Sequence, residues 1–63
     1  MLQEFTLRSA RMYRNKTIKQ VAEYLRVTEQ TIYNWENGKT VIPAPTFLRF
    51  CLWLEIEPKQ FTF

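Results

Sequence analysis

The fold of this chain is decided by residues 17–39, TIKQVAEYLRVTEQTIYNWENGK. Thr17 is followed three residues later by Gln20, a T-x-x-Q pattern typical of a capped helix N-terminus. Thr28 can cap a second helix, and Gly38 can end it, because glycine readily adopts the left-handed conformation that closes helices. The apolar residues between these signals recur at helical spacing and form the expected motif core: Val21, Ala22, Leu25, Val27, Ile32 and Trp35. The pattern predicts two short amphipathic helices joined by a tight turn, over about residues 17–38.

Helical signals continue on both sides of this motif. Residues 4–14 are predicted to form a first helix with one apolar face. Pro45 suits the first turn of a further helix that ends near Leu54, and Pro58 opens a last short helical turn. The sequence therefore predicts an all-α, compact five-helix fold with a helix-turn-helix.

Length and composition limit the class of protein. The 63 residues have room for one small domain, which we expect over residues 1–63. Hydrophobic residues make up 46% of the chain, enough for a folded core. No apolar run approaches the roughly 20 residues that span a membrane. A single cysteine, Cys51, excludes an internal disulfide and favours a reducing cytoplasm.

The sequence offers no catalytic or metal-binding chemistry. It contains no His and one Cys, too few ligands for a zinc site within one chain. It also lacks a Gly-rich phosphate loop and a credible pair of nucleophile and base. We therefore expect no enzymatic activity, no cofactor, no metal and no small-molecule ligand.

Charge is concentrated in the N-terminal part of the chain. The net charge is +3, but residues 8–26 carry six basic side chains against one acidic side chain, Glu23. Residues 27–63 carry three basic and four acidic side chains. A polyanion would be attracted to the N-terminal half, although a solvated basic face explains this charge equally well.

Several segments together resemble the Cro/CI-type helix-turn-helix domain, which is also described as lambda-repressor-like or XRE-type. LRSAR at residues 7–11 is similar to the family's first helix, TIKQVAEYL at 17–25 to the second, and VTEQTIYNWENGK at 27–39 to the turn and third helix. Arg26 stands where the family usually has Gly, so it must accept a strained or slightly different turn. The resemblance covers nearly the whole chain and implies a DNA-binding domain.

The resemblance also implies which residues contact DNA. It places Glu29, Gln30 and Asn34 at base-reading positions, at the start of a helix that lies in the major groove. Gln and Asn can bond adenine, and Glu can accept from cytosine. Further contacts, mainly to the DNA backbone, are expected from Arg8, Arg14, Lys19, Thr31, Tyr33, Asn37, Lys39 and Thr40. Relatives use backbone amides as well as short polar groups around residues 37–40 to bind phosphates.

A structural ion pair is implied between Arg11 and Glu36. Relatives commonly pair an arginine of the first helix with a glutamate near the end of the third helix. A partly buried pair would orient the recognition helix more than it would add net stability.

The helix near residues 45–54 is apolar on nearly every side. One apolar stripe is enough for the core, so the remaining apolar side chains predict an interface. We expect a homodimer, at least on a near-palindromic double-stranded operator, through a surface that includes Leu48, Leu52, Trp53 and Phe63.

The resulting hypothesis is a small phage or mobile-element repressor that binds double-stranded DNA at specific sequences, in the cytoplasm of a bacterial or phage-infected host cell. Two alternatives stay open. The same scaffold can act as a protein-interaction module, such as an antitoxin or a regulator's partner, or as an excisionase-type architectural DNA binder. The helical segment after residue 45, in place of a β wing, argues against the excisionase type.

Overall fold

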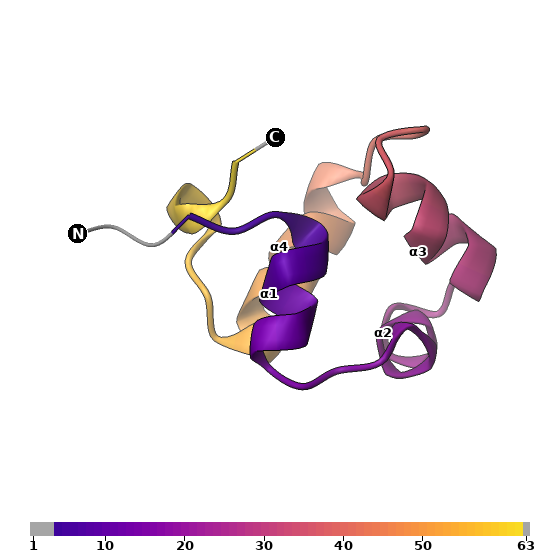
Figure 1. Cartoon of the computed structure of the whole chain (residues 1–63), viewed down its shortest axis with the longest axis horizontal. Helices are drawn as coiled ribbons and strands as arrows, with labels where there is room; N and C mark the ends of the chain where they lie inside the picture. Colours follow the sequence, from indigo (N-terminus) through magenta and orange to yellow (C-terminus); the bar gives the residue numbers. More distant parts are fainter. Residues whose placement is uncertain (1–3, 63) are drawn as a thin grey trace.

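The computed structural model describes residues 4–62 and contains four α-helices (Figure 1). They are α1 (Leu7–Tyr13), α2 (Ile18–Leu25), α3 (Glu29–Glu36) and α4 (Ala44–Leu54). The five-helix prediction is wrong in its last element, which is a single 3-10 turn, η1 (Pro58–Gln60). The turn stays short because the chain becomes extended at Phe61, where its backbone pairs with the N-terminal segment.

The first helix begins at Leu7, three residues later than the apolar pattern predicted. Thr6 caps it: the Thr6 hydroxyl accepts from the Ser9 amide at 3.1 Å, and the Ser9 hydroxyl accepts from the Thr6 amide at 2.8 Å. Phe5 is extended and forms an isolated parallel bridge with Phe61. Only 4% of Phe5 is exposed, because the extended backbone lets the ring reach the core.

The two motif helices are capped by the threonines that the sequence indicated, Thr17 before α2 and Thr28 before α3. The Thr17 hydroxyl accepts from the Gln20 amide, and the Gln20 side chain accepts from the Thr17 amide at 2.8 Å, which completes the capping box. The Thr28 hydroxyl accepts from the Thr31 amide at 3.1 Å. Local side-chain chemistry thus determines where α2 and α3 start.

The turn between α2 and α3 contains a left-handed residue. Arg26 ends α2 with φ 59° and ψ 46°, the conformation that its place in the turn requires. Glu55 ends α4 in nearly the same conformation, with φ 58°. Gly38, after α3, has φ 74°. A non-glycine residue in this region is strained, so Arg26 and Glu55 both carry a local cost.

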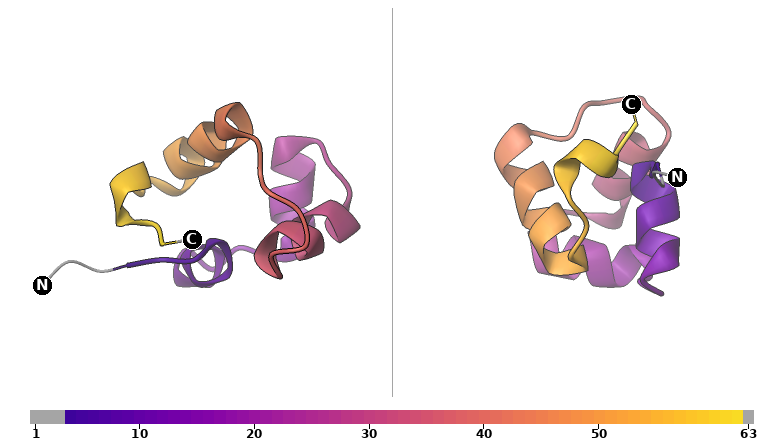
Figure 2. Two further views of the ribbon diagram at one scale, coloured as in Figure 1. Left: turned by 90° about the horizontal axis from the view of Figure 1, so that it is seen from above. Right: turned by 90° about the vertical axis from the view of Figure 1, so that its left-hand side faces the viewer.

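All four α-helices contribute to one hydrophobic core. Within the helix-turn-helix, Val21, Ala22, Leu25 and Ile32 are buried, while Val27 and Trp35 are partly buried against them. The remaining buried members are Phe5, Ala10, Phe50, Leu54 and Ile56. Helices α1 and α4 lie on two sides of the molecule, α2 and α3 close one end, and η1 lies at the other end (Figure 2). The core thereby holds the helix-turn-helix with its outer face in solvent.

Candidate nucleic-acid interface

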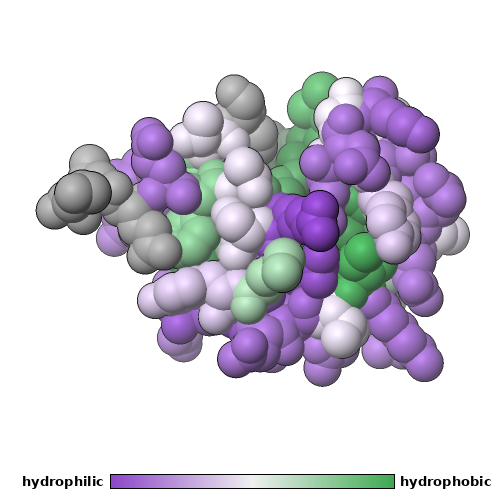
Figure 3. Space-filling model, in the orientation of Figure 1, coloured by the Kyte–Doolittle hydropathy of each residue, from purple (hydrophilic) through white to green (hydrophobic). Residues whose placement is uncertain are grey.

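The outer face of α3 is polar and accessible. Ile32 is 3% exposed and Trp35 packs against the core, so these two side chains set the rotation of the helix. Glu29, Gln30 and Tyr33 are exposed on the other side. Thr31 and Asn34 are half-buried at the edges. In the view of Figure 3, hydrophilic residues likewise dominate the end of the molecule formed by α2 and α3.

Two of the predicted base-reading residues are bonded to each other. The Gln30 side-chain amide donates to the Asn34 side-chain oxygen at 3.1 Å. The bond uses one of the two Gln30 amide hydrogens, so the Gln30 carbonyl and the Asn34 NH2 group keep their hydrogen-bonding capacity. Sequence reasoning treated the two residues separately, although their i, i+4 spacing on a helix could have indicated the contact.

The loop after α3 offers side chains but few free backbone groups. The amides of Asn37 and Gly38 donate to Tyr33 and Trp35 carbonyls at 3.0 and 3.3 Å. Those of Lys39 and Thr40 both donate to the Asn34 carbonyl, at 2.9 and 3.4 Å. The expected use of these four amides on phosphate is therefore corrected, since each already closes the end of the helix. The side chains of Asn37, Lys39 and Thr40 are exposed.

Lys19, Arg8 and Arg14 are all exposed, and Arg14 in addition has partners within the molecule. Arg14 Nε donates to the Leu54 carbonyl at 2.8 Å, and Nη2 donates to the Glu55 carbonyl at 3.4 Å. Its guanidinium satisfies carbonyls that the end of α4 would otherwise leave unpaired. Arg14 therefore has a structural role at the end of α4, and its contact with the DNA backbone stays a prediction that its remaining N–H groups could serve.

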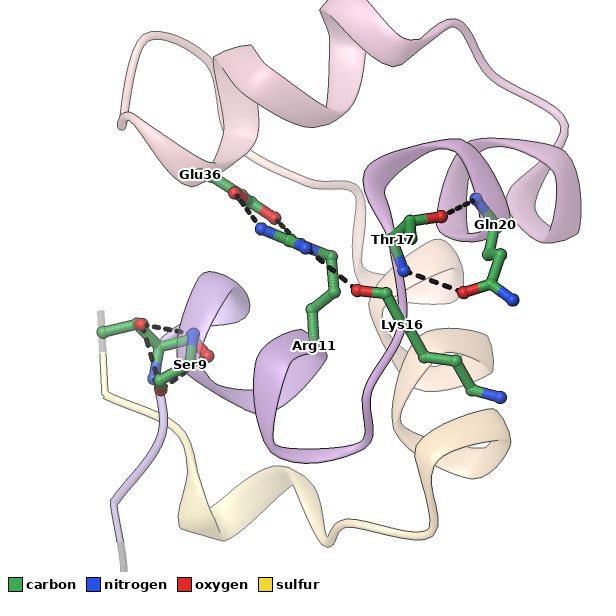
Figure 4. Close-up of polar contacts among 7 residues, drawn as sticks. Ser9, Arg11, Lys16, Thr17, Gln20 and Glu36 are labelled. Carbon is green, nitrogen blue, oxygen red and sulfur yellow. Dashed lines mark hydrogen bonds and ion pairs between the residues drawn. The ribbon is translucent and has the colours of Figure 1, made fainter.

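An ion pair joins α1 to the end of α3 (Figure 4). Arg11 Nε lies 2.8 Å from Glu36 Oε2, and Arg11 Nη2 lies 3.5 Å from Oε1. Arg11 Nη1 also donates to the Lys16 carbonyl at 2.9 Å, a contact that the sequence did not indicate. The two side chains are only 12% and 7% exposed. The pair therefore holds the C-terminal end of α3 against α1 in a largely dry environment.

The outer face of α4 is apolar over part of its length. Leu48 is 51% exposed and Leu52 is 78% exposed. Beside them runs a groove of about 510 Å³, lined by Leu48, Cys51, Leu52, Glu55, Ile56, Glu57 and Pro58. Trp53 does not line this groove, and its ring stacks on Tyr24 of α2 with 4.4 Å between ring centroids, so its place in a dimer surface stays a prediction. Phe63 lies outside the described residues.

Cys51 is a buried hydrophobic residue of this groove wall. It is 2% exposed, and burial raises the pKa of its thiol to about 11. A protonated, enclosed thiol is a poor nucleophile and a poor metal ligand. Among residues 4–62, no cluster of His, Cys, Asp and Glu could hold a metal ion.

These features define a helix-turn-helix protein. Helices α2 and α3 are both capped, a left-handed residue joins them, and α3 packs its inner side on the core while its polar side faces solvent. A family model described as a helix-turn-helix domain matches residues 6–61. The chain belongs to this family, as a helix-turn-helix DNA-binding domain of the Cro/CI-like kind. Comparisons with curated proteins and with solved structures give no match. Within the described part of the chain, no helix has the length and apolar character needed to cross a bilayer.

Proposed function

We propose that this protein is a sequence-specific transcriptional regulator, a small repressor of the kind used by phages and mobile elements, with α3 in the major groove of double-stranded DNA. The observation that carries the proposal is the outer face of α3. Its capped N-terminal turn presents Glu29 and Gln30 to solvent, while Ile32 anchors the opposite side in the core. Helix-turn-helix proteins direct this part of the recognition helix at base edges.

Base reading is assigned to Gln30, Asn34 and Glu29. The bond between Gln30 and Asn34 orients both amides before DNA arrives, which lowers the entropy lost on binding. Gln30 then bonds adenine, with Asn34 beside it, and Glu29 accepts from the amino group of cytosine. Phosphates repel Glu29, so it selects against other bases more than it adds affinity.

Contacts to the DNA backbone fix the position of α3 in the groove. Exposed cations on the neighbouring segments supply them: Lys19 on α2, Lys39 in the loop after α3 and Arg8 on α1. The side-chain hydroxyl groups of Thr31, Tyr33 and Thr40 and the side-chain amide of Asn37 add further hydrogen bonds to the DNA backbone. Such contacts give affinity and register without reading sequence.

Dimerisation is proposed through α4. Leu48 and Leu52 stand exposed beside an apolar groove, and a second copy would bury both. Two recognition helices would then meet successive major-groove segments, about 34 Å apart, on a near-palindromic operator. The same surface supports a second candidate function, a protein-interaction module whose partner covers α4. The excisionase-type alternative is less well supported, because residues 4–62 contain helices and one isolated bridge and no β wing.

Selection of bound sites from random duplex DNA tests the proposal. We expect one enriched, near-palindromic sequence, bound at least about a thousandfold more tightly than mixed DNA. Lys39→Ala should weaken binding to all duplexes and lower the salt slope by about one. Lys59→Ala is the matched control, an exposed lysine paired with Glu57 at the other end of the molecule. Binding without preference among duplexes would refute the regulator and favour the interaction module.

A further inference from the structure

Four side chains at the edge of the buried core connect α2 and the segment before it to α4. We name them the cation–aromatic cluster: Lys16, Tyr24, Arg49 and Trp53. The Tyr24 and Trp53 rings stack with centroids 4.4 Å apart and an interplanar angle of 7°. Lys16 Nζ lies 5.0 Å from the Trp53 centroid, and Arg49 Cζ lies 5.5 Å from the Tyr24 centroid. Each ring thus has an aromatic partner and a cation within range for attraction.

The cluster connects three parts of the chain. Tyr24 is on the last turn of α2, Trp53 and Arg49 are one turn apart on α4, and Lys16 is in the connection between α1 and α2. Arg49 also donates to the Tyr24 carbonyl at 3.4 Å, so it contacts the α2 backbone as well as the ring. These contacts restrict both the distance and the rotation of α2 relative to α4.

Lys16 links the cluster to the ion pair on the other side of the motif. Its carbonyl accepts from Arg11, which pairs with Glu36, while its ammonium lies over Trp53. Figure 4 shows the Lys16 carbonyl directed at Arg11 and its side chain extending away from that contact. The helix-turn-helix is therefore held twice, at the end of α3 by the ion pair and at the end of α2 by the cluster.

Both rings are more exposed than the inner residues of α2, although Trp53 also packs against the edge of the core. Tyr24 is 37% exposed and Trp53 is half-buried, whereas Val21 and Leu25 on the inner side of α2 are 2% and 5% exposed. The inner residues already bury the apolar stripe of α2. The outer rings, with their directional stacking, add orientation to a helix that is already attached.

We propose that the cation–aromatic cluster is a positioning element that sets the placement of α2, and through it α3, for DNA recognition. The proposal rests on the proposed function, since it assigns positioning residues to the same DNA-binding surface. It also gives Lys16 and Arg49 a role other than phosphate binding, because both cations lie over rings on the α2–α4 side.

The test compares two tyrosines in equivalent settings. Tyr24→Leu removes the stack, and Tyr24→Phe retains it. Tyr13→Leu is the matched control, because Tyr13 is also on the last turn of its helix, packs on a ring (Phe5, 5.2 Å) and carries an arginine 5.0 Å away (Arg14). Affinities for the selected operator and for mixed duplex DNA would be measured at a temperature where every variant is folded.

Tyr24→Leu should weaken operator binding about tenfold, with mixed-DNA binding changed by less than about twofold. Tyr24→Phe and Tyr13→Leu should leave the ratio of the two affinities unchanged. In the free protein, amide chemical shifts of α3 should move in Tyr24→Leu and stay in Tyr13→Leu. Equal loss of specificity in both leucine variants, or unmoved α3 amides, would overturn the positioning role.

Arg49→Gln provides a second test that leaves both rings and the core in place. It should lower the ratio of specific to mixed-DNA affinity without changing the salt slope, whereas Arg8→Gln should reduce the slope. An unchanged ratio in Arg49→Gln would contradict the proposal even if Tyr24→Leu did not fold. A wild-type protein with no preference among duplexes would refute the proposed function instead, and the α3 amide shifts would still decide whether the cluster places the helix.

Discussion

Helices α3 and α4 bury their inner faces in the same core but present opposite chemistry to solvent. The inner faces carry Ile32 on α3 and Phe50 and Leu54 on α4, all at most 3% exposed. The outer face of α3 carries amide, carboxylate and hydroxyl groups, whereas that of α4 exposes Leu48 and Leu52. Directional hydrogen-bonding groups can distinguish bases, and apolar surface gains most from contact with another apolar surface. The difference supports one nucleic-acid surface and one protein surface on the same small core.

The largest effect should come from removing the anchor of the polar face. Glu36→Ala leaves Arg11 charged and largely buried, so we expect the free energy of unfolding to fall by about 3 kcal/mol. Urea denaturation measures the loss, and Arg11→Ala should cost a similar amount. The double variant should cost much less than the sum of the two, because both remove the same contact. Additive effects would show that the pair is not coupled.

The next effect concerns base discrimination by α3. Gln30→Ala should reduce discrimination at one operator position by about 1–3 kcal/mol, with thermal stability unchanged because the side chain is exposed. Asn34→Ala should relax its own position and also that of Gln30, since it removes the bond that orients the Gln30 amide. Binding to single-base operator variants measures both changes. Independent effects at two separate positions would contradict this coupling.

The apolar face of α4 can be tested separately from the polar face of α3. Leu52→Gln should weaken dimerisation by about 1.5 kcal/mol per buried side chain. The reason is that glutamine removes less apolar area from water than leucine does when two copies associate. Sedimentation equilibrium measures this change, and folding stability should stay the same since Leu52 is 78% exposed. Val41→Gln is the control, an 88% exposed apolar residue away from the groove. A wild-type protein that stays monomeric with and without operator DNA would remove the dimer.

A smaller effect is expected where α2 and α4 end. Arg26→Gly and Glu55→Gly should each raise the free energy of unfolding by up to about 1 kcal/mol, because glycine adopts the left-handed conformation without a Cβ clash. Arg26→Ala and Glu55→Ala are the controls and should give no gain, since they keep the Cβ. Thermal denaturation of the four variants tests whether the left-handed residues at the ends of α2 and α4 carry equal backbone strain. A gain in the alanine variants would assign the effect to charge instead.

The last effect is absent at neutral pH and concerns the inner wall of the α4 groove. Burial raises the pKa of the Cys51 thiol from its ordinary 9.0 to about 11, so the folded state holds this proton more tightly than the unfolded state. The thiol's contribution to stability is therefore complete below pH 9.0 and declines as pH rises towards 11. Unfolding of the wild type and of Cys51→Ala, compared across this range, should show the steeper decline in the wild type. Parallel pH profiles would contradict a raised pKa.

Much of the fold and of the candidate site follows from local sequence. Thr17 and Thr28 fix the starts of α2 and α3, because each hydroxyl oxygen accepts a hydrogen bond from the free backbone amide three residues later. Helical spacing places Ile32 and Trp35 inward, and with them the polar edge of α3 outward. The Arg11–Glu36 pair could be predicted only from the resemblance to the family, since Arg11 and Glu36 lie 25 residues apart in the sequence.

Other features required the assembled molecule. The extended Phe5 pairs with Phe61, Arg14 satisfies the end of α4, and Trp53 stacks on Tyr24, all between segments that are distant in sequence. Spacing within one helix cannot reveal these partners, because an arginine that meets only water and one that bonds the end of another helix have the same local pattern. The sequence alone determined which residues could begin helices, enter a core or face water. Only the tertiary structure decided which charged groups and aromatic rings have partners within the molecule, because burial and long-range contacts arise when distant segments meet.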